Sequence, residues 1–345
     1  MNPSTISRVV VTGATGNVGT SLVRLLAREP RVGSVLGLAR RRPGLELPGV
    51  EWAEVDLSRE GDEPLLAQHV ADADAVVHLA WRFGPTHDPV ETWRTNVLGS
   101  VRVFDAVAAA RVPVLVYASS VGAYSPGPAG GAPVSEAWPT HGWPGAAYTR
   151  EKAYLERVLD TFERDHPMIR VVRMRPAFLF KEESASGQRR IFAGRFFPGQ
   201  LMRPDLLPLL PEFDGLRFQV LHTEDAAAAY GQALLRDVRG AFNLAAEPVI
   251  DAAVLGELLD AKPVRVPAGA VRGALSAAWR LRLAPASPGL FDALRHMPLL
   301  ATERARRDLA WEPTRTSLEA LEAFLRGVRA GAGDDTGPLA GHRIG

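Results

Sequence analysis

Tyr148 and Lys152 stand four residues apart, and the chemistry that this pair could carry is proton transfer. Residues 148–166 are expected to form a helix, so a spacing of four places the phenol and the ammonium on one helix face. A free phenol has a pKa of about 10 and is a poor base at neutral pH, but a neighbouring positive charge lowers that pKa. Only three lysines occur in the chain, at 152, 181 and 262, so this offset seldom arises by chance. The pair predicts an acid/base centre.

Two serines, Ser119 and Ser120, follow an expected strand at residues 114–118. Open α/β sheets bind their ligands beyond the carboxyl ends of the strands, so a hydroxyl at this place could hold a substrate oxygen. The alternative is a pair of hydroxyls that satisfy a turn.

Three glycines, Gly13, Gly16 and Gly19, occur three apart in the run TGATGNVG, between a strand at 9–12 and a helix at 17–28. Glycines at this junction let the backbone approach a pyrophosphate, whose charge meets the amides and dipole of the helix N-terminus. A glycine-rich turn without a ligand is the alternative. The position directly after the first strand favours the dinucleotide site.

Arg40 and Arg41 follow the second strand, roughly 20 residues past the glycines, where NAD-preferring sites carry a carboxylate for the ribose hydroxyls. No Asp or Glu lies between Arg31 and Gly44. Guanidinium groups form charge-assisted bonds to a 2′-phosphate, which favours NADP over NAD. The alternative is a solvated basic turn.

The elements that position these residues alternate between strands and helices. Strands are expected at 9–12, 34–39, 51–55, 75–79, 114–118, 169–174, 216–221 and 242–245, and crossover helices at 17–28, 62–70, 89–110, 148–166 and 224–235. This alternation predicts an α/β fold with a doubly wound (Rossmann) parallel sheet of about seven strands.

The regular alternation fails at 180–210 and 250–300, where Pro, Gly and Arg are frequent. We therefore expect a dinucleotide-binding domain at 1–178 plus 215–245, and a smaller interleaved substrate-binding lobe at 179–214 plus 246–328. A last helix is expected at 317–326. Residues 329–345, rich in Gly and Asp, are expected to be a disordered tail.

Composition excludes several classes of function. Forty Lys and Arg against 39 Asp and Glu give a net charge of +1, without the basic stripe that nucleic-acid binding requires. There is no cysteine, and the eight histidines lack metal-ligand spacing, so no metal site is expected. No apolar run approaches the ~20 residues of a membrane span, and no signal-peptide pattern is present. We expect a cytoplasmic protein with no membrane partner.

These motifs together resemble the extended short-chain dehydrogenase/reductase family, also called the NAD-dependent epimerase/dehydratase family. Besides the glycines and the Tyr/Lys pair, the resemblance includes Asp56-Leu57, His78-Leu79-Ala80, Thr95-Asn96-Val97 and the 117–120 run. It implies that Tyr148 is the acid/base, that Lys152 binds the nicotinamide ribose and lowers the tyrosine pKa, and that Ser120 hydrogen-bonds the reacting oxygen. The cofactor contacts that it implies are Gly13, Thr15, Gly16, Asn17, Val18, Gly19, Arg40, Arg41, Asp56, Leu57, Leu79, Ala80, Asn96, Tyr148, Lys152, Pro176 and Phe178.

Two departures from the family pattern narrow the chemistry. Sugar dehydratases carry an Asp-Glu pair after the catalytic hydroxyl, whereas Ser120 is followed by Val121 and Gly122. Nucleotide-sugar epimerases usually have an asparagine soon after the Arg-containing strand, whereas residues 176–180 here read PAFLF.

The sequence therefore favours an NAD(P)-dependent oxidoreductase that moves hydride between NADP(H) and a small-molecule carbonyl or secondary alcohol. An NAD-dependent sugar epimerase or dehydratase with a retained cofactor is the alternative, and a non-catalytic NADP-sensing regulator is a lesser one. The resemblance also suggests a homodimer that packs the 89–110 and 148–166 helices against their mates. Trp81, Phe83 and Trp93 either line the substrate mouth or pack over a helix. Asn96 either supports the cofactor pocket or is a buried structural amide.

Overall fold

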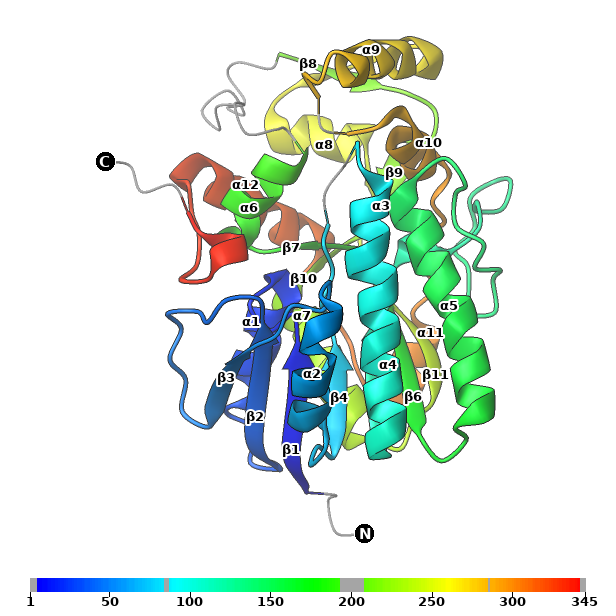
Figure 1. Cartoon of the computed structure of the whole chain (residues 1–345). Helices are drawn as coiled ribbons and strands as arrows, with labels where there is room; N and C mark the ends of the chain where they lie inside the picture. Colours follow the sequence, from blue (N-terminus) through cyan, green and yellow to red (C-terminus); the bar gives the residue numbers. More distant parts are fainter. Residues whose placement is uncertain (1–4, 84–86, 193–207, 285, 342–345) are drawn as a thin grey trace.

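A seven-stranded parallel sheet lies at the centre of the chain (Figure 1). The computed structural model describes residues 5–83, 87–192, 208–284 and 286–341. The strands run in the order β11-β6-β5-β4-β1-β2-β3 and all neighbours pair in parallel. They are β1 (Ile6–Thr12), β2 (Val32–Ala39), β3 (Val50–Glu54), β4 (Ala75–His78), β5 (Val114–Ala118), β6 (Arg170–Pro176) and β11 (Gly240–Leu244). The expected doubly wound sheet is confirmed.

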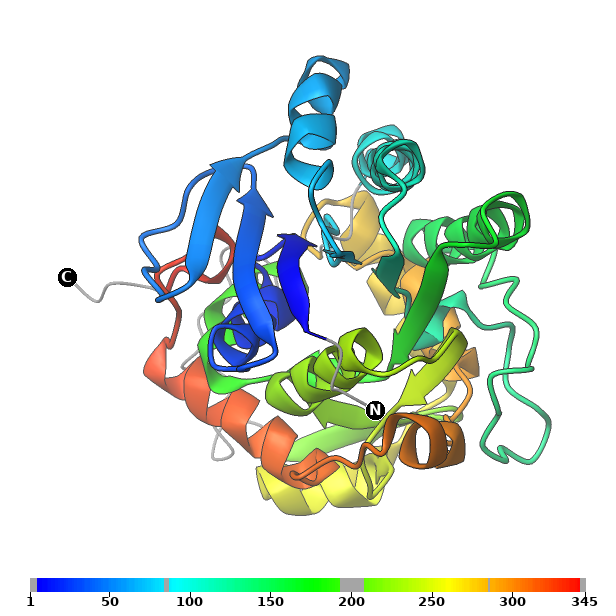
Figure 2. The same ribbon diagram turned by 90° about the horizontal axis from the view of Figure 1, so that it is seen from below.

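Helices cover both faces of this sheet, as Figure 2 shows along the strands. Val9, Val10 and Val11 of β1 are completely buried, because a parallel strand covered on both faces is apolar throughout. One face packs against α1 (Asn17–Leu26), α7 (Thr223–Leu235) and α11 (Glu303–Leu309). The other packs against α2 (Glu63–Val70), α4 (Gly99–Ala110) and α5 (Ala147–Asp165).

The helix expected over 89–110 contains a π-helical turn. It starts as α3 (Pro89–Thr92) and continues through the π-turn η2 (Trp93–Leu98) into α4. The Asp88 carboxylate caps α3 by accepting hydrogen bonds from the backbone N–H groups of Val90 and Glu91. A π-turn inserts an extra residue into a helix and is frequent at functional sites. This turn carries Asn96.

A second lobe lies beyond the carboxyl ends of the strands. In the described part of this lobe, the strands form three two-stranded sheets, β7–β10, β9–β12 and β8–β13. They are β7 (Phe178–Phe180), β8 (Leu209–Glu212), β9 (Arg217–Phe218), β10 (Val220–His222), β12 (Ile250–Asp251) and β13 (Lys262–Arg265), and the helices are α6 (Ala185–Phe192), α8 (Ala252–Leu259), α9 (Ala268–Arg280), α10 (Pro288–His296) and α12 (Ser317–Ala330). Short 3₁₀ turns are η1 (Glu60–Asp62), η3 (Val121–Ala123), η4 (Glu182–Ser184) and η7 (Gly337–Leu339).

Two elements differ from the expected division into domains. The strand expected at 216–221 is split into β9 and β10, which pair with β12 and β7 instead of joining the large sheet. Helix α11, expected within the lobe, packs against α7 and β11 through Ala305 and Leu309, which are completely buried. Its apolar side chains complete the cover of the sheet.

The described part of the expected disordered tail is folded. Gly331 ends α12 with a left-handed φ of 63°, and beyond it Thr336 and Leu339 are buried. Asp334 forms an ion pair with Arg24 of α1 over 3.0 Å. The Gly- and Asp-rich composition is thus overridden by tertiary contacts, and residues 342–345 lie outside the described part.

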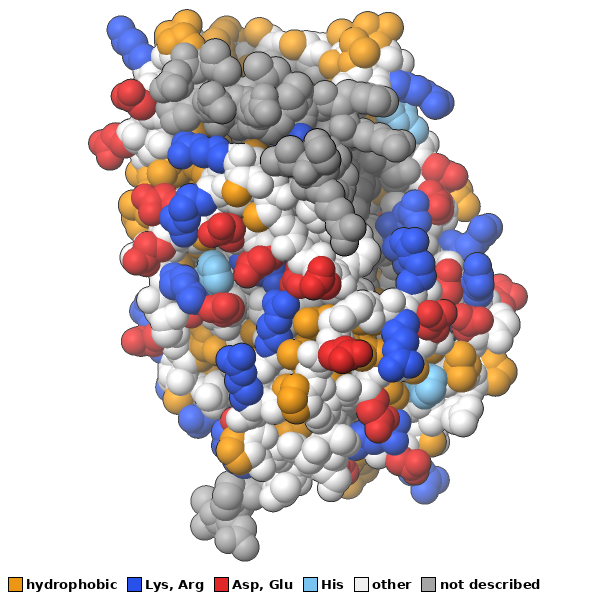
Figure 3. Space-filling model, turned by 90° about the vertical axis from the view of Figure 1, so that its left-hand side faces the viewer, with side chains coloured by type: hydrophobic (Ala, Val, Ile, Leu, Met, Phe, Trp, Pro, Cys, Tyr) orange, Lys and Arg blue, Asp and Glu red, His pale blue; other side chains and the backbone are white. Residues whose placement is uncertain are grey.

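Basic and acidic side chains alternate over the surface seen in Figure 3. Among the residues that the structure describes, no helix is long and apolar enough to cross a membrane.

Candidate active site

The carboxyl edge of the parallel sheet gathers the residues that the sequence singled out. Because the strands are parallel, the segments that follow them meet at one edge of the sheet. Gly13 follows β1, Asp56 and Leu57 follow β3, Leu79 and Ala80 follow β4, Ser120 follows β5, and Pro176 ends β6.

Tyr148 and Ser120 are in direct contact at this edge. The Tyr148 phenol donates a hydrogen bond to Ser120 Oγ over 2.8 Å. Ser120 Oγ also accepts a hydrogen bond from Gly122 N over 3.0 Å, at the start of η3. The 3₁₀ turn after β5 therefore fixes the serine, and the first turn of α5 presents the phenol to it.

Lys152 lies one turn further along α5 and is 3% exposed. Its Nζ donates a hydrogen bond to the Ala118 carbonyl oxygen over 2.6 Å and lies 3.5 Å from the centroid of the Trp81 ring. The ammonium is therefore held by a carbonyl and an aromatic face, both of which attract a cation.

The pKa values of the pair differ from the sequence expectation. Burial raises the pKa of Tyr148 to about 12, although the hydrogen bond with Ser120 lowers it, and the Glu151 carboxylate adds to the rise. Burial also lowers the pKa of Lys152 to about 7, against the attraction of Glu151 and Glu156. The expected lowering of the tyrosine pKa by the lysine is thus wrong for this structure, because desolvation dominates and the Lys152 amine bonds to Ala118.

The glycine turn after β1 has the shape of a phosphate cradle. Gly13 has a φ of +67°, and a Cβ there would lie 2.6 Å from the Ala80 backbone. A Cβ at Gly19 would collide with the Gly13 carbonyl oxygen, while one at Gly16 would lie 3.2 Å from it. Larger residues would close this turn, so its backbone fits the close approach of a pyrophosphate.

The adenosine end of the expected site is basic and exposed. Arg40 and Arg41 are both exposed after β2. Burial raises the pKa of Asp56, but hydrogen bonds from Ser58 and the charges of Arg40 and Arg59 outweigh it and lower the pKa. Arg40 therefore lies near Asp56, which is one of the expected cofactor contacts.

Asn96 clamps the loop that follows β4. Its Oδ1 accepts a hydrogen bond from Arg82 N over 2.7 Å, and its Nδ2 donates to Arg82 O over 3.2 Å. The same Nδ2 donates to Glu151 Oε2 over 2.8 Å, and Thr92 Oγ1 donates to Glu151 Oε1 over 2.5 Å. Of its two expected roles, Asn96 thus has that of a buried structural amide. The loop that it holds lines the site.

Glu151 was not singled out from the sequence, although it stands between Tyr148 and Lys152 on α5. It is 2% exposed, and burial raises its pKa against the hydrogen bonds from Asn96 and Thr92. A carboxylate three residues after a candidate tyrosine was the available signal.

A second buried network fixes the serine turn. Glu156 is completely buried and accepts hydrogen bonds from Ser119 Oγ over 2.6 Å and from Arg175 Nε over 2.9 Å. Arg173 Nη1 approaches the same carboxylate at 3.0 Å. Burial raises the pKa of Glu156, but the hydrogen bonds and charges of the two arginines outweigh it and lower the pKa to about 2. Strands β5 and β6 and helix α5 are therefore locked together beside Ser120.

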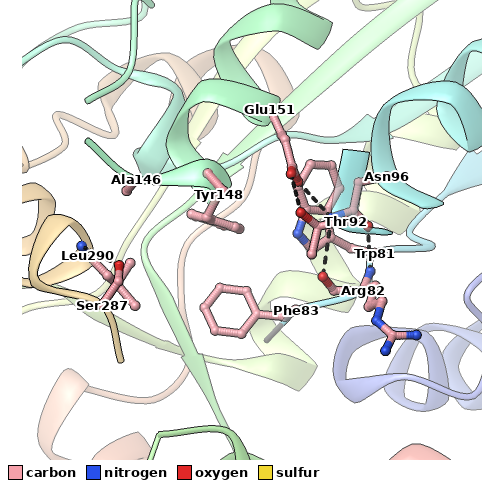
Figure 4. Close-up of a pocket in the computed structure, with 11 residues that line it drawn as sticks. Trp81, Arg82, Phe83, Thr92, Asn96, Ala146, Tyr148, Glu151, Ser287 and Leu290 are labelled. Atoms are coloured by element: carbon pink, nitrogen blue, oxygen red, sulfur yellow. Dashed lines mark hydrogen bonds between the residues drawn. The ribbon is translucent and has the colours of Figure 1, made fainter. Parts of the chain in front are cut away.

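A pocket opens in front of Tyr148 (Figure 4). The Phe83 ring lies 4.9 Å from the Tyr148 ring in an edge-on arrangement, and Trp81 lies 5.8 Å from it. Helix α10 and the residue before it contribute Leu290 and Ser287 from the other lobe. The lining residues are Trp81, Arg82, Phe83, Thr92, Asn96, Ala146, Ala147, Tyr148, Glu151, Ser287 and Leu290.

Some predicted contact residues point elsewhere. The Asn17 amide donates to the Leu179 carbonyl over 3.0 Å, and its Oδ1 is buried without a hydrogen-bond partner. The Phe178 ring packs edge-on against Phe218 in the core of the lobe, at 5.5 Å. Trp93 is 36% exposed, and its ring lies tilted against the Tyr154 ring at 4.9 Å. It therefore packs over helix α5 and is not among the pocket-lining residues.

His78 is structural. Its ring hydrogen-bonds Thr12 Oγ1 and Ser100 Oγ, at 2.6 and 2.8 Å, and burial together with the Lys152 charge lowers its pKa to about 3. Within the described ranges, no group of three His, Cys, Asp or Glu side chains could hold a metal ion.

Comparisons with known proteins find distant relatives of this chain. An uncharacterized protein of Mycobacterium tuberculosis is 24% identical over 330 residues, which cover 92% of this chain and 83% of the relative. The L-arabinose 1-dehydrogenase (NAD(P)(+)) of Haloferax volcanii is 34% identical over 115 residues, which cover 33% of this chain and 41% of that enzyme.

Among solved structures, the UDP-glucose 4-epimerase of Thermotoga maritima with UDP-glucose has the same fold. Its TM-score is 0.71 at 18% identity, with 94% of this chain and 99% of that chain covered. The sequence model of the NAD dependent epimerase/dehydratase family matches residues 9–245, which are more than half of the chain. With the glycine cradle, the hydroxyl turn and the Tyr/Lys helix all inside that range, the chain belongs to the NAD-dependent epimerase/dehydratase family.

Proposed function

We propose that this chain is an NADP(H)-dependent oxidoreductase that transfers hydride between the cofactor and a carbonyl or secondary-alcohol substrate. The observation that carries the proposal is the 2.8 Å hydrogen bond between Tyr148 and Ser120, at the mouth of a pocket on the sheet edge where this fold binds its ligands. The bound nicotinamide supplies or accepts the hydride.

The residues of this chain supply the proton and hold the oxygen. The Tyr148 phenol, whose pKa is raised to about 12 by burial, is protonated at neutral pH and can donate its proton to the oxygen of a carbonyl being reduced. Ser120 can turn its hydroxyl toward that same oxygen, because its position is fixed by the bond from Gly122 N. Lys152, on the same face of α5, stabilises in its protonated form the negative charge that the phenol acquires when it gives up its proton.

NADP is preferred in this proposal because two exposed arginines follow β2. Arg40 and Arg41 extend from the end of the strand where dinucleotide folds bind the adenosine ribose. Guanidinium groups bind a 2′-phosphate by charge-assisted hydrogen bonds. The similarity to an L-arabinose 1-dehydrogenase that uses NAD(P)(+) also supports a redox reaction.

A sugar epimerase or dehydratase with a retained cofactor is the second candidate, supported by the fold shared with UDP-glucose 4-epimerase. Val121 and Gly122 after the catalytic hydroxyl, and residues 176–180 without an asparagine, speak against both sugar activities. A non-catalytic NADP sensor is less well supported, since it would have no use for the Tyr148–Ser120 contact.

The test is to denature the purified protein and to determine the amount, phosphorylation and redox state of the released dinucleotide. Little retained cofactor, with NADPH binding reversibly and more tightly than NADH, is the expected result. Near-equimolar NAD or NADH released from the protein would instead support the epimerase and contradict the NADP preference.

We further propose a cytoplasmic homodimer. Helices α3 to α5 expose apolar side chains on their outer surface: Val90 is 64% exposed, Leu98 41% and Tyr154 46%. Packing these side chains against a second copy would remove them from water. Light scattering after gel filtration should give twice the mass of the chain, and Leu98→Glu should yield monomers.

A further inference from the structure

The segment after α12 runs back across the first βα unit. The Ser186 amide donates to the Ala332 carbonyl over 3.3 Å, and the Asp334 carboxylate pairs with Arg24 of α1. Asp334 N donates to Leu339 O over 2.9 Å, which closes residues 334–339 into a compact turn. Leu339, 4% exposed, anchors this turn in the protein. Figures 1 and 2 both place this red segment beside the blue first part of the chain.

This turn contacts the two loops between which a dinucleotide fold binds its adenosine ribose. Thr336, 3% exposed, donates its hydroxyl to the Thr15 carbonyl oxygen within the glycine turn, over 3.0 Å. A Cβ on Gly337 would lie 3.7 Å from Arg41 Nη2, and one on Gly44 would lie 3.9 Å from the Asp335 carbonyl oxygen. The turn therefore connects the glycine turn after β1 to the arginine loop after β2.

We propose that residues 334–339 are part of the cofactor site and form the outer wall of the adenosine ribose pocket. The first βα turn and the end of the second strand take the pyrophosphate and the ribose hydroxyls in this fold. A segment that fixes Thr15 and lies against Arg41 sets the distance between them. It thereby pre-organises the guanidinium for a ribose phosphate, which reduces the cost of ordering it on binding. The inference rests on the proposed function only in requiring that the chain binds a dinucleotide.

The contact pattern separates this role from plain structural packing. A tail that only covered apolar surface would be anchored by Leu339 and by the ion pair on α1. The Thr336 hydroxyl instead donates its hydrogen bond to the Thr15 carbonyl oxygen, which belongs to the glycine turn itself. Removing that hydroxyl deletes a contact to the cofactor loop and leaves the anchor points in place.

The test measures direct binding by titration calorimetry on the unmodified protein, on Thr336→Val and on a chain that ends at residue 330. The probes are NADPH, adenosine 2′,5′-bisphosphate and reduced nicotinamide mononucleotide, which lacks the adenosine half. Ser34→Ala is the matched control, because it deletes another hydroxyl-to-carbonyl hydrogen bond, to Ser7 O over 3.1 Å. This bond lies at the amino ends of the strands, away from the site. Melting temperatures report on folding.

We expect Thr336→Val to weaken NADPH and adenosine 2′,5′-bisphosphate about fivefold, as the loss of one hydrogen bond predicts, and the truncation to weaken them about tenfold or more. Binding of the mononucleotide and all binding by Ser34→Ala should stay unchanged. Wild-type affinity for the adenosine probes in Thr336→Val would overturn the inference, as would an equal loss for all three probes. A wild-type protein that binds no dinucleotide would overturn the proposed function first, and the inference with it.

Discussion

The amine of Lys152 lies 3.5 Å from the centroid of the Trp81 ring, and its hydrogen bond goes to the Ala118 carbonyl and not to Tyr148. The indole shields the amine from water, and burial lowers the lysine pKa to about 7. Lys152 therefore changes its charge in the pH range in which the enzyme is expected to work.

This burial predicts a pH-dependent stability that Lys152→Met removes. The pKa is about 7 in the folded protein, against the ordinary value of 10.5, so between these limits the folded state binds fewer protons than the unfolded state. Wild-type stability should therefore rise with pH in this window, by at most about 1.4 kcal/mol per pH unit. Urea unfolding at pH 6 and pH 9 gives the free energy of unfolding of both proteins. The gain in this free energy of Lys152→Met over the wild type should be larger at pH 6 than at pH 9. Lys262→Met, at an exposed lysine, is the control, and parallel pH profiles for all three proteins would contradict the burial argument.

The hydroxyl pair predicts a separation of catalysis from binding. Tyr148→Phe removes the proton donor and should lower kcat by about 10²- to 10⁴-fold on any carbonyl compound that the wild type reduces. Ser120→Ala removes one hydrogen bond to the reacting oxygen and should cost about 10²-fold. NADPH affinity, measured by fluorescence titration, should change less than about twofold in Ser120→Ala. An unchanged kcat in Tyr148→Phe would remove tyrosine from the mechanism.

The glycine turn predicts a defect in cofactor binding when Gly13 is replaced by alanine. Gly13→Ala introduces a Cβ 2.6 Å from the Ala80 backbone at a φ of +67°, so the turn must shift. We expect NADPH binding to be lost and thermal stability to fall. Gly61→Ala, where a Cβ would have nothing within 4 Å, should behave as the wild type in both assays. Normal NADPH affinity in Gly13→Ala would show that the cradle is not needed.

The buried Glu156 carboxylate predicts a large loss of stability when one of its arginine partners is removed. Arg175→Met leaves Glu156 completely buried with one fewer partner, which should cost about 3–5 kcal/mol in unfolding free energy. Because the folded pKa of Glu156 is lowered to about 2 from 4.5, its contribution is present above pH 4.5 and is lost as the pH falls toward 2. Chemical denaturation at pH 7 and pH 3 should show a smaller difference between wild type and variant at pH 3. Arg164→Met, which breaks an exposed ion pair, is the control, and its free energy of unfolding should equal that of the wild type at both pH values.

The large sheet was predictable because each of its strands can be recognised from the local sequence. Runs such as VVVT at the end of β1 are β-branched and bounded by glycine, and the expected strand at 114–118 coincides with β5. The lobe was not predictable, because its strands are short and pair across long separations. Lys262 lies opposite Leu209, for example, in a contact that no local pattern encodes.

The site was predictable where it depends on order along the chain, and not where it depends on side-chain packing. Ser120 and Tyr148 meet because one follows β5 and the other begins α5. The partners of Glu151 and the rise in the Tyr148 pKa depend on burial, which the spacing of residues does not determine. The contact between Thr336 and Thr15 joins the two ends of the chain, where composition alone suggested disorder.

Strand β11 pairs with β6 in parallel, Phe242 lying opposite Met174, although part of the lobe and helix α7 separate the two strands in sequence. During synthesis, β6 leaves the ribosome as an edge strand whose N–H and C=O groups have no partner on one side. That edge stays open until residue 244 has emerged. Nascent chains that end between β6 and β11 are therefore the stage at which we expect this protein to depend most on chaperones.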